Sequence, residues 1–378
     1  MGSAAAYQLA RANRSVLLLE QFEIGHARGS SPGESRIIRL SYDHPTYVRL
    51  AQAAYRLWAE AEVDLGLKLI TPTGGLDLSA PHNPAFEACI ASLTEVNVPH
   101  AVLDAGEIRR RFPQFQIDDQ TLGLWQADAG ILNPTQCVTA FAQAAANHGA
   151  HVLERTPARS ILLRDNGVEV ITDSATYRGR KLIISAGAWT KPLLQSLGVD
   201  VPLIVTQEQY AFFELRHADQ HTPDRFPIFI HYGQTRLEER SAVKSIGAER
   251  IDYYGFPVFG REGLKVGEHH AGPPVTADTR SFEVDPVCLQ RLAAYARATF
   301  PDSTGEVLHA ATCLYTNTPD QHFLVDTLPG YSNVIVASPC SGHGFKFSIL
   351  IGRILADLAT RGPTEYPIEL FGLARFGS

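Results

Sequence analysis

Reactive side chains gather most densely near the end of the sequence, in the run Cys340-Ser341-Gly342-His343-Gly344-Phe345-Lys346. The run follows an apolar stretch, residues 334–338, which predicts a buried strand, and it precedes a helix that ends at Gly362-Pro363. A strand, a glycine-rich turn and a helix start together present backbone N–H groups to an anion or to the edge of a cofactor. We therefore expect a ligand to bind at this turn.

Three other places carry groups capable of chemistry. Lys265 and His269 share one face of an expected strand, since side chains alternate with period two, although a solvated face explains them equally well. Arg36 and Arg39 lie near one face if their segment is helical, and form either a solvated basic edge or an anion clamp. Cys313 taken alone indicates a small buried thiol.

Two elements that position a ligand stand at the start of the chain. Residues 2–10 predict a helix that begins at Gly2, and residues 15–19 predict an apolar strand that is followed by Glu20. This order is the second half of a βαβ dinucleotide fold, in which a glycine lets the helix N-terminus take a pyrophosphate and an acid accepts the ribose hydroxyls. The alternative is an ordinary helix–strand pair.

The first strand and the first two glycines of that motif are missing from the chain. We expect their absence to leave the two neighbouring strands without a partner and the pyrophosphate half-cradled. One hypothesis is that the sequence starts downstream of the true start or is truncated.

Composition limits the classes of protein that the chain can represent. Its 378 residues suggest two or three lobes, and with 45% hydrophobic and 19% charged residues it has enough apolar material for a core. A net charge of −7 argues against nucleic acid or an anionic membrane as the main partner. No apolar run approaches a membrane span and no leader is evident, so a cytoplasmic location is expected. The five cysteines have no paired spacing, and we expect no disulfide framework and no metal site.

The rest of the chain predicts a change of architecture in the middle. Residues 71–79 predict a hairpin around Gly74-Gly75, and the strand at 181–184 runs into a small-residue turn at Gly187, where a backbone can approach a ligand closely. From residue 203 to 259 the strands become rich in aromatic residues, which indicates a second, mostly antiparallel lobe.

The segment between Phe229 and Tyr253 is long and charged, and it holds Arg236, Glu238, Glu239 and Arg240. It forms either a lid or a surface insertion, and the second is the more common fate of such a loop.

Five blocks stand in order along nearly the whole chain: Ser30-Ser31 with Gly33-Glu34-Ser35-Arg36-Ile37-Ile38-Arg39, Tyr253-Tyr254-Gly255-Phe256-Pro257, Gly263-Leu264-Lys265-Val266-Gly267 with His269, Cys313-Leu314-Tyr315-Thr316, and Ser341-Gly342-His343-Gly344-Phe345-Lys346-Phe347. Together they resemble the family of monomeric sarcosine oxidases and N-methyltryptophan oxidases, which also includes pipecolate oxidases. The resemblance implies an FAD-dependent amine oxidase of secondary amino acids such as sarcosine. Such an enzyme oxidises the C–N bond to an imine that hydrolyses, and it reduces O2 to H2O2.

The resemblance also implies a fold and a domain division. The expected fold is an α/β, Rossmann-like FAD-binding lobe, with its first strand missing, and an α+β substrate lobe with a mainly antiparallel sheet. The FAD-binding domain would be discontinuous, comprising residues 1–70, 129–202 and 308–378. The substrate domain would comprise residues 71–128 and 203–307.

The same resemblance assigns roles to site residues. Arg39 and Lys346 match a clamp for the substrate carboxylate, and Lys265 matches the lysine that activates O2. Groups that line the substrate cavity are matched by Tyr254, Tyr315 and His269. Expected cofactor contacts are Gly2, Glu20, Ser30, Ser31, Arg36, Gly187, Gly342, His343, Gly344, Phe345 and Lys346, with covalent attachment of FAD through Cys313. Pro32 departs from the pattern, since these oxidases usually carry a histidine there.

Other readings of the sequence stay open. One is a related FAD dehydrogenase that passes electrons to a quinone, or an oxidase of pipecolate, glycine or glycated amino acids. Another is a flavin-free, non-enzymatic relative, because the first strand of the cofactor motif is missing. The expected partners are a small amino acid substrate and O2, and the expected oligomeric state is a monomer.

Overall fold

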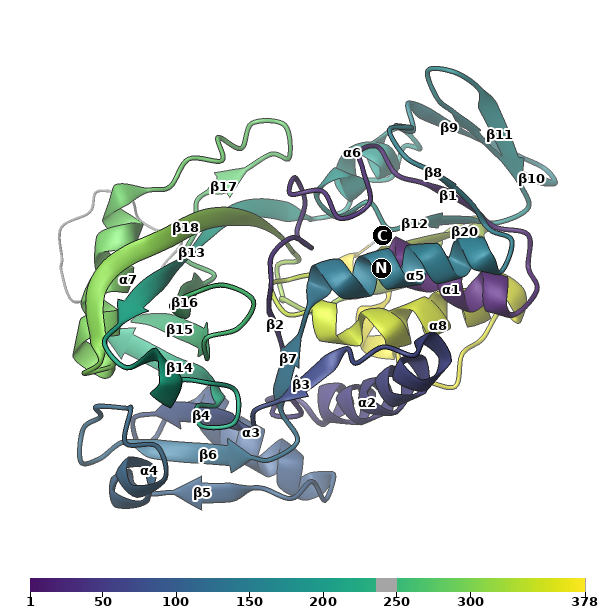
Figure 1. The fold of residues 1–378 in the computed structure, drawn as a ribbon. Coiled ribbons are helices and arrows are strands. Elements are labelled where there is room, and N and C mark those ends of the chain that lie inside the picture. Colours follow the sequence, from purple (N-terminus) through teal and green to yellow (C-terminus); the bar gives the residue numbers. More distant parts are fainter. Residues whose placement is uncertain (236–249, 378) are drawn as a thin grey trace.

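The computed structural model describes residues 1–235 and 250–377, which form two lobes joined by a small sheet (Figure 1). Arg236, Glu238, Glu239 and Arg240, named above for a lid or an insertion, lie outside the described residues.

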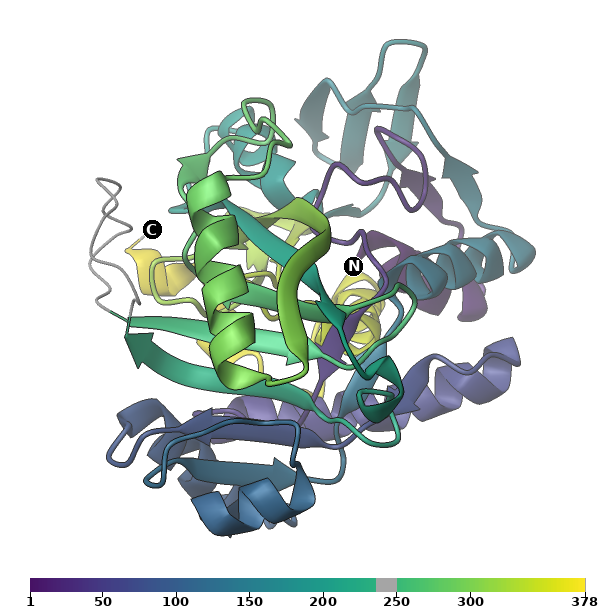
Figure 2. The same cartoon turned by 60° about the vertical axis from the view of Figure 1, so that its left-hand side comes forward.

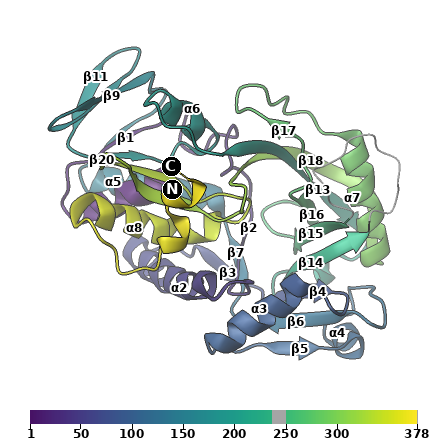
Figure 3. The same cartoon turned by 180° about the vertical axis from the view of Figure 1, so that it is seen from behind.

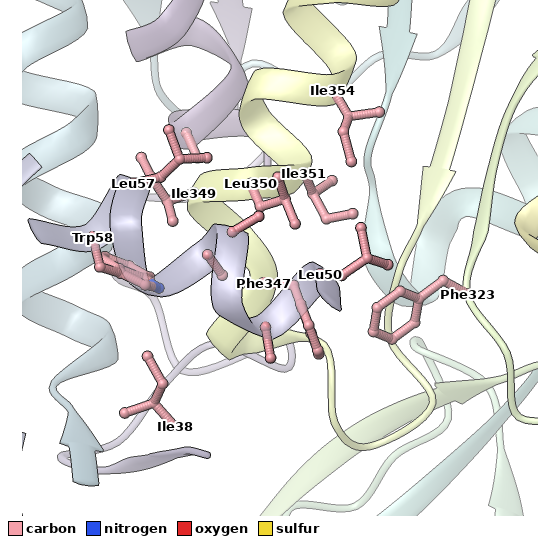
Figure 4. Packing of buried hydrophobic residues seen from close by; sticks show 14 of the residues in the cluster. Ile38, Leu50, Leu57, Trp58, Phe323, Phe347, Ile349, Leu350, Ile351 and Ile354 are labelled. Atoms are coloured by element: carbon pink, nitrogen blue, oxygen red, sulfur yellow. The ribbon is translucent and has the colours of Figure 1, made fainter. Parts of the chain in front are cut away.

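Four helices dominate the first lobe. They are α1 (Gly2–Arg11), α2 (Pro45–Leu65), α5 (Pro134–Asn147) and α8 (Ser348–Thr360). Helix α8 packs against α1, α2 and the strand β20 (Figure 3). A Cβ atom on Gly352 would lie 2.6 Å from the backbone of Ala4, so this glycine permits the close approach of α8 to α1. Figure 4 shows Leu57 and Trp58 of α2 beside the apolar face of α8, which carries Leu350, Ile351 and Ile354.

The strands of this lobe form short, separate sheets. They are β1 (Leu17–Leu19) with β8 (His151–Leu153); β9 (Ser160–Arg164), β10 (Gly167–Ile171) and β11 (Thr176–Gly179); and β12 (Leu182–Ile184), β20 (Tyr331–Ser338) and β19 (Leu324–Leu328). The pairs β1–β8 and β12–β20 are parallel. Within the described chain, β1 pairs only with β8, and β12 pairs only with β20.

The second lobe is built on one large sheet in the order β17-β13-β16-β15-β14-β4-β6-β5, with β18 also paired to β13. Among the described residues its pairs are antiparallel apart from β14 with β4. The strands are β4 (Gly75–Ser79), β5 (Ala101–Leu103), β6 (Leu122–Gln126), β13 (Ile204–Leu215), β14 (Ile228–Thr235), β15 (Arg250–Phe256), β16 (Leu264–His269), β17 (Pro274–Val275) and β18 (Ser303–Asn317). The remaining α-helices of the described chain are α3 (Pro84–Glu95), α4 (Ala105–Arg111), α6 (Thr190–Gln195) and α7 (Pro286–Thr299). The two-lobe α/β and antiparallel architecture expected from the sequence is confirmed.

The two faces of the large sheet differ in kind. Helix α7 covers one face (Figure 2). On that face Leu264 and Val266 of β16 join Leu292 and Ala296 of α7 in an apolar core. Because side chains alternate along a strand, the intervening Lys265 lies on the other face, which looks toward the first lobe. The alternation expected for this strand is therefore present.

A small sheet joins the lobes. It decides the conformation around Arg36, which the sequence left open, and it corrects one local prediction. Strands β2 (Arg36–Ile38) and β3 (Ile70–Pro72) both pair with β7 (Gly130–Leu132), so the segment around Arg36 is extended and not helical. The hairpin predicted around Gly74-Gly75 is wrong, because β3 belongs to this sheet and β4 to the large one. The backbone N–H of Gly74 donates to the carbonyl of Ala129 instead.

Candidate active site

One cavity of about 1810 Å³ lies between the lobes. All the site residues expected from the sequence line it: Gly2, Glu20, Ser30, Ser31, Arg36, Arg39, Gly187, Tyr254, Lys265, His269, Cys313, Tyr315, Gly342, His343, Gly344, Phe345 and Lys346. One arm of the cavity runs between β1 and β12, and the other reaches the face of the large sheet that α7 leaves open. The cavity exceeds the roughly 300–1000 Å³ typical of a single small-ligand site, so it can hold a dinucleotide and a substrate together.

The first arm has the features of a dinucleotide site. Gly2 begins α1, and a Cβ atom there would lie 3.1 Å from Ser185 Oγ, so a larger residue would crowd the start of the helix. Glu20 follows β1, and its carboxylate accepts a hydrogen bond from the backbone N–H of Phe22. Gly187 has a φ of 55° and open space where a side chain would stand. These residues fit the pyrophosphate and ribose of FAD.

The middle of the cavity carries a pair of cations that we call the flavin-side cluster, Arg36 and Lys265. The Arg36 guanidinium donates to the carbonyls of Ser30 at 2.9 Å, Pro32 at 2.7 Å and Ser35 at 2.8 Å, and thereby shapes the loop. The Lys265 ammonium donates to Ser35 Oγ at 3.0 Å and is 2% exposed.

Burial, and then the neighbouring Arg36 charge, lower the pKa of Lys265 to about 7. In the same loop, Ser30 Oγ is buried without a hydrogen-bond partner in the described chain, as expected of a group that meets a ligand.

Cys313 lies beside this cluster on β18. Its thiol is buried, which raises its pKa, while the positive charge of Arg36 opposes the rise. The preceding residue is fixed by Arg280, whose guanidinium donates to the Thr312 carbonyl at 3.1 Å and to its hydroxyl at 2.8 Å. The thiol is therefore held on a rigid strand at the wall of the cavity.

A second set of charges, which we call the substrate-side cluster, consists of Arg39, Asp77 and Lys346. Arg39 Nη1 donates to Asp77 Oδ2 at 2.7 Å, and Asp77 is 2% exposed. Burial raises the pKa of the Asp77 carboxyl, and the Arg39 charge opposes the rise and favours the ionised form. Lys346 Nζ donates to the Tyr42 hydroxyl at 2.8 Å and to the His343 carbonyl at 2.9 Å. Burial and the Arg39 charge lower the pKa of Lys346 well below its usual range.

Neutral polar groups occupy the space between the two clusters. His269 Nδ1 lies 3.2 Å from the Tyr315 hydroxyl, and Tyr254 meets the His269 ring edge-on. Burial and the adjacent His270 lower the pKa of His269 well below its usual range, so its ring is neutral at pH 7. Gly342, with a φ of 77°, packs under Tyr315, and a Cβ atom there would lie 2.4 Å from that ring. The turn therefore requires glycine.

Two residues of this site were missed by the sequence reasoning. Asp77 interrupts the apolar strand Gly75-Leu76-Asp77-Leu78, and an acid flanked by leucines in a buried strand is a signal that it has a charged partner. Tyr42 carried no such signal, because its role depends on the contact with Lys346, which is distant in sequence. In the described part of the chain, no group of three His, Cys, Asp or Glu side chains is arranged to hold a metal ion.

Comparison with known proteins agrees with this geometry. The model of the FAD dependent oxidoreductase family matches residues 1–358. The fold and the cavity thus define a flavin-dependent oxidoreductase, and the chain belongs to that family. Within it, the chain groups with the monomeric sarcosine oxidases and N-methyltryptophan oxidases, as the sequence predicted.

Individual relatives match over nearly their full length. The monomeric sarcosine oxidase of Streptomyces avermitilis is 37% identical over 100% of this chain and 96% of its own. The N-methyl-L-tryptophan oxidase of Salmonella heidelberg is 32% identical over the same shares. Among solved structures, NikD, an amino acid oxidase of nikkomycin biosynthesis, aligns with a TM-score of 0.84 at 25% identity and covers 98% of this chain and 94% of its own.

Proposed function

We propose that this protein oxidises the secondary amine of a small amino acid, sarcosine or another N-methyl amino acid, and passes the electrons to O2. For sarcosine the balanced reaction is sarcosine, O2 and H2O giving glycine, formaldehyde and H2O2. One observation carries the proposal: a single cavity holds a dinucleotide arm, a buried lysine beside Cys313, and a buried arginine and lysine that can grip a carboxylate. The names of the relatives support the same substrate class.

Bound FAD supplies the two-electron oxidation of the C–N bond. We assign its adenosine end to Gly2, Glu20 and Gly187. Its flavin end is assigned to the loop of Ser30, Ser31 and Arg36 and to the turn of Gly342, His343, Gly344, Phe345 and Lys346. The backbone N–H groups of that turn and the Arg36 charge favour negative charge at the flavin end.

The chain's own groups bind and orient the amino acid. Arg39 offers a planar fork of N–H donors to the carboxylate, and Lys346 adds a point charge. His269 is neutral, so it adds no repulsion to a neighbouring amine and offers a ring nitrogen as a hydrogen-bond acceptor. Tyr254 and Tyr315 line the walls and exclude water from the reacting atoms.

On the flavin side, Lys265 stabilises the negative charge that develops on O2 as it accepts electrons. The ammonium is held by Ser35 and by the rings of Tyr210, 4.3 Å away, and Phe256, 4.8 Å away. A developing anion beside it favours its charged form.

We also propose that FAD is attached covalently through Cys313, by a C–S bond that replaces the thiol S–H bond and a C–H bond of the flavin, whose ring takes up the two electrons and passes them to O2. The buried thiol lines the cavity, and Arg36, Lys265 and Arg280 are the positive charges that act on it. Acid precipitation followed by mass measurement tests this: the wild-type chain should carry the mass of FAD, and the variant Cys313→Ala should release all of its flavin. A wild-type chain that releases its flavin in acid would contradict covalent attachment.

The experiment that tests the function is an oxygen-electrode and peroxide assay with sarcosine, N-methyl-L-tryptophan, L-pipecolate, L-proline and glycine. We expect equal molar O2 consumption and H2O2 formation with one or more of the secondary amines. Reduction of a quinone or dye without O2 consumption would instead identify a dehydrogenase, and a colourless protein that binds no FAD would exclude both.

We propose a cytoplasmic monomer. In the described residues no helix is both long enough and apolar enough to cross a membrane. Light scattering of the purified protein measures its oligomeric state.

A further inference from the structure

The Arg39 side chain is held along one edge. Its recorded hydrogen bonds all leave from Nη1, to Asp77 Oδ2 at 2.7 Å, to Ser41 Oγ at 3.2 Å and to the Tyr232 hydroxyl at 3.3 Å. Within the described chain, Nε and Nη2 have no recorded acceptor, and the side chain lines the cavity with 13% of its surface exposed. The Nε–Nη2 edge is thus the one available to a ligand, and Asp77 fixes that orientation.

Asp77 also changes the charge of the site. Arg39 Cζ lies 5.4 Å and Lys346 Nζ 5.3 Å from the centroid of the Tyr42 ring, and both side chains line the same cavity, so the two cations belong to one chamber. A bound carboxylate favours the charged form of Lys346. Arg39, Asp77, Lys346 and one ligand carboxylate then sum to zero charge.

A second ligand carboxylate would leave this buried chamber with an unbalanced negative charge. Such a charge is costly where water is excluded.

We propose that Asp77 is a positioning and specificity-determining residue that restricts the site to monocarboxylic amino acids and excludes dicarboxylic ones. The inference rests on the proposed function, in which Arg39 and Lys346 bind the substrate carboxylate. It differs from a purely structural role for the ion pair, because a structural pair would not set the preference between ligands of equal shape.

The test uses two nearly isosteric ligands that have no amine and cannot be oxidised, succinamate with one carboxylate and succinate with two. Calorimetry on the FAD-loaded protein measures both dissociation constants. We expect wild type to prefer succinamate by about tenfold or more. In Asp77→Asn, which keeps an acceptor for Arg39 Nη1 but removes the charge, this preference should fall by about tenfold.

A charge cycle keeps the test decisive if one variant fails to fold. Arg39→Gln removes the positive charge and should weaken binding of both ligands. Adding Asp77→Asn to Arg39→Gln restores the net charge of wild type, so the double variant should bind succinamate more tightly than Arg39→Gln and return the preference to its wild-type value. The matched control is Glu95→Gln, which breaks the exposed ion pair with Arg49, 2.9 Å long, and should leave the preference within about twofold.

An unchanged preference in Asp77→Asn, or a wild-type protein that does not bind succinamate, would overturn the proposal. So would a double variant that binds succinamate no better than Arg39→Gln alone. Because the ligands do not react, these outcomes are independent of turnover. If no amine is oxidised while the charge cycle behaves as expected, the proposed function fails and the role of Asp77 stands.

Discussion

The flavin-side cluster and the substrate-side cluster each contain an arginine and a buried lysine, yet their arginines are satisfied in different ways. Arg36 donates to three backbone carbonyls, which accept hydrogen bonds without neutralising its charge. Arg39 donates to the carboxylate of Asp77, which neutralises it. Under the proposed function, the first arrangement offers a net positive field to an anion that forms during the reaction, and the second balances the charge of an anion that arrives with the substrate.

The lysines follow the same division. Lys265 lies next to Arg36, which forms no ion pair with any described residue, and its pKa is lowered to about 7 by burial and by that charge. Lys346 lies near Arg39, but the negative charge of Asp77 offsets part of the repulsion. We therefore expect changes in the flavin-side cluster to affect the oxygen reaction and changes in the substrate-side cluster to affect substrate binding.

The largest effect is expected from Lys265→Met. Loss of a charge aimed at a developing anion typically costs about 10²–10³ in rate, so the second-order rate constant with O2 should fall by about that factor. Reduction of the flavin by substrate without oxygen should change by less than about fivefold. Stopped-flow spectroscopy measures the rate constants of both half-reactions. Equal losses in the two would show that the two clusters do not act on separate half-reactions.

A smaller loss, in substrate binding and not in the oxygen reaction, is expected from Arg39→Lys. Lysine keeps the positive charge, but it lacks the planar set of N–H donors with which arginine binds Asp77 and the substrate carboxylate together. One charge-assisted hydrogen bond to the substrate is therefore lost. We expect kcat/KM for the amino acid to fall about 10- to 100-fold, mainly through KM, with the O2 rate constant unchanged. Steady-state kinetics at several O2 concentrations checks this, and a loss confined to the O2 term would reverse the assignment.

The two clusters could not be predicted equally well from the sequence. The period of β16 placed Lys265 and His269 on one face, because that inference needs only the alternation of one strand, but it left open whether that face meets solvent or a site. Asp77 was missed because its significance depends on β4 facing Arg39 across the lobes, a contact between residues 38 positions apart.

Local turn signals were similarly limited. Gly74 does adopt the positive φ, 68°, that its glycine permits, but a turn signal in the sequence does not say whether the flanking strands pair with each other. A Cβ atom there would lie 2.0 Å from the Trp125 ring, so tertiary packing set its conformation. Here β3 and β4 belong to two different sheets, so the predicted hairpin is absent.

The smallest expected effect is on the pH dependence of the free energy of unfolding, and it distinguishes Lys265 from Lys346. Unfolding restores the ordinary pKa of Lys265, about 10.4, so between its folded value near 7 and that value the unfolded chain binds more protons. Stability of the FAD-free protein should therefore rise with pH, by about 1 kcal/mol from pH 7 to 8 for this group. Lys265→Met should lose that increment, whereas the contribution of Lys346 remains in both proteins. Urea unfolding of wild type and variant at both pH values measures the difference, and parallel pH dependences would mean that Lys265 does not titrate in this range.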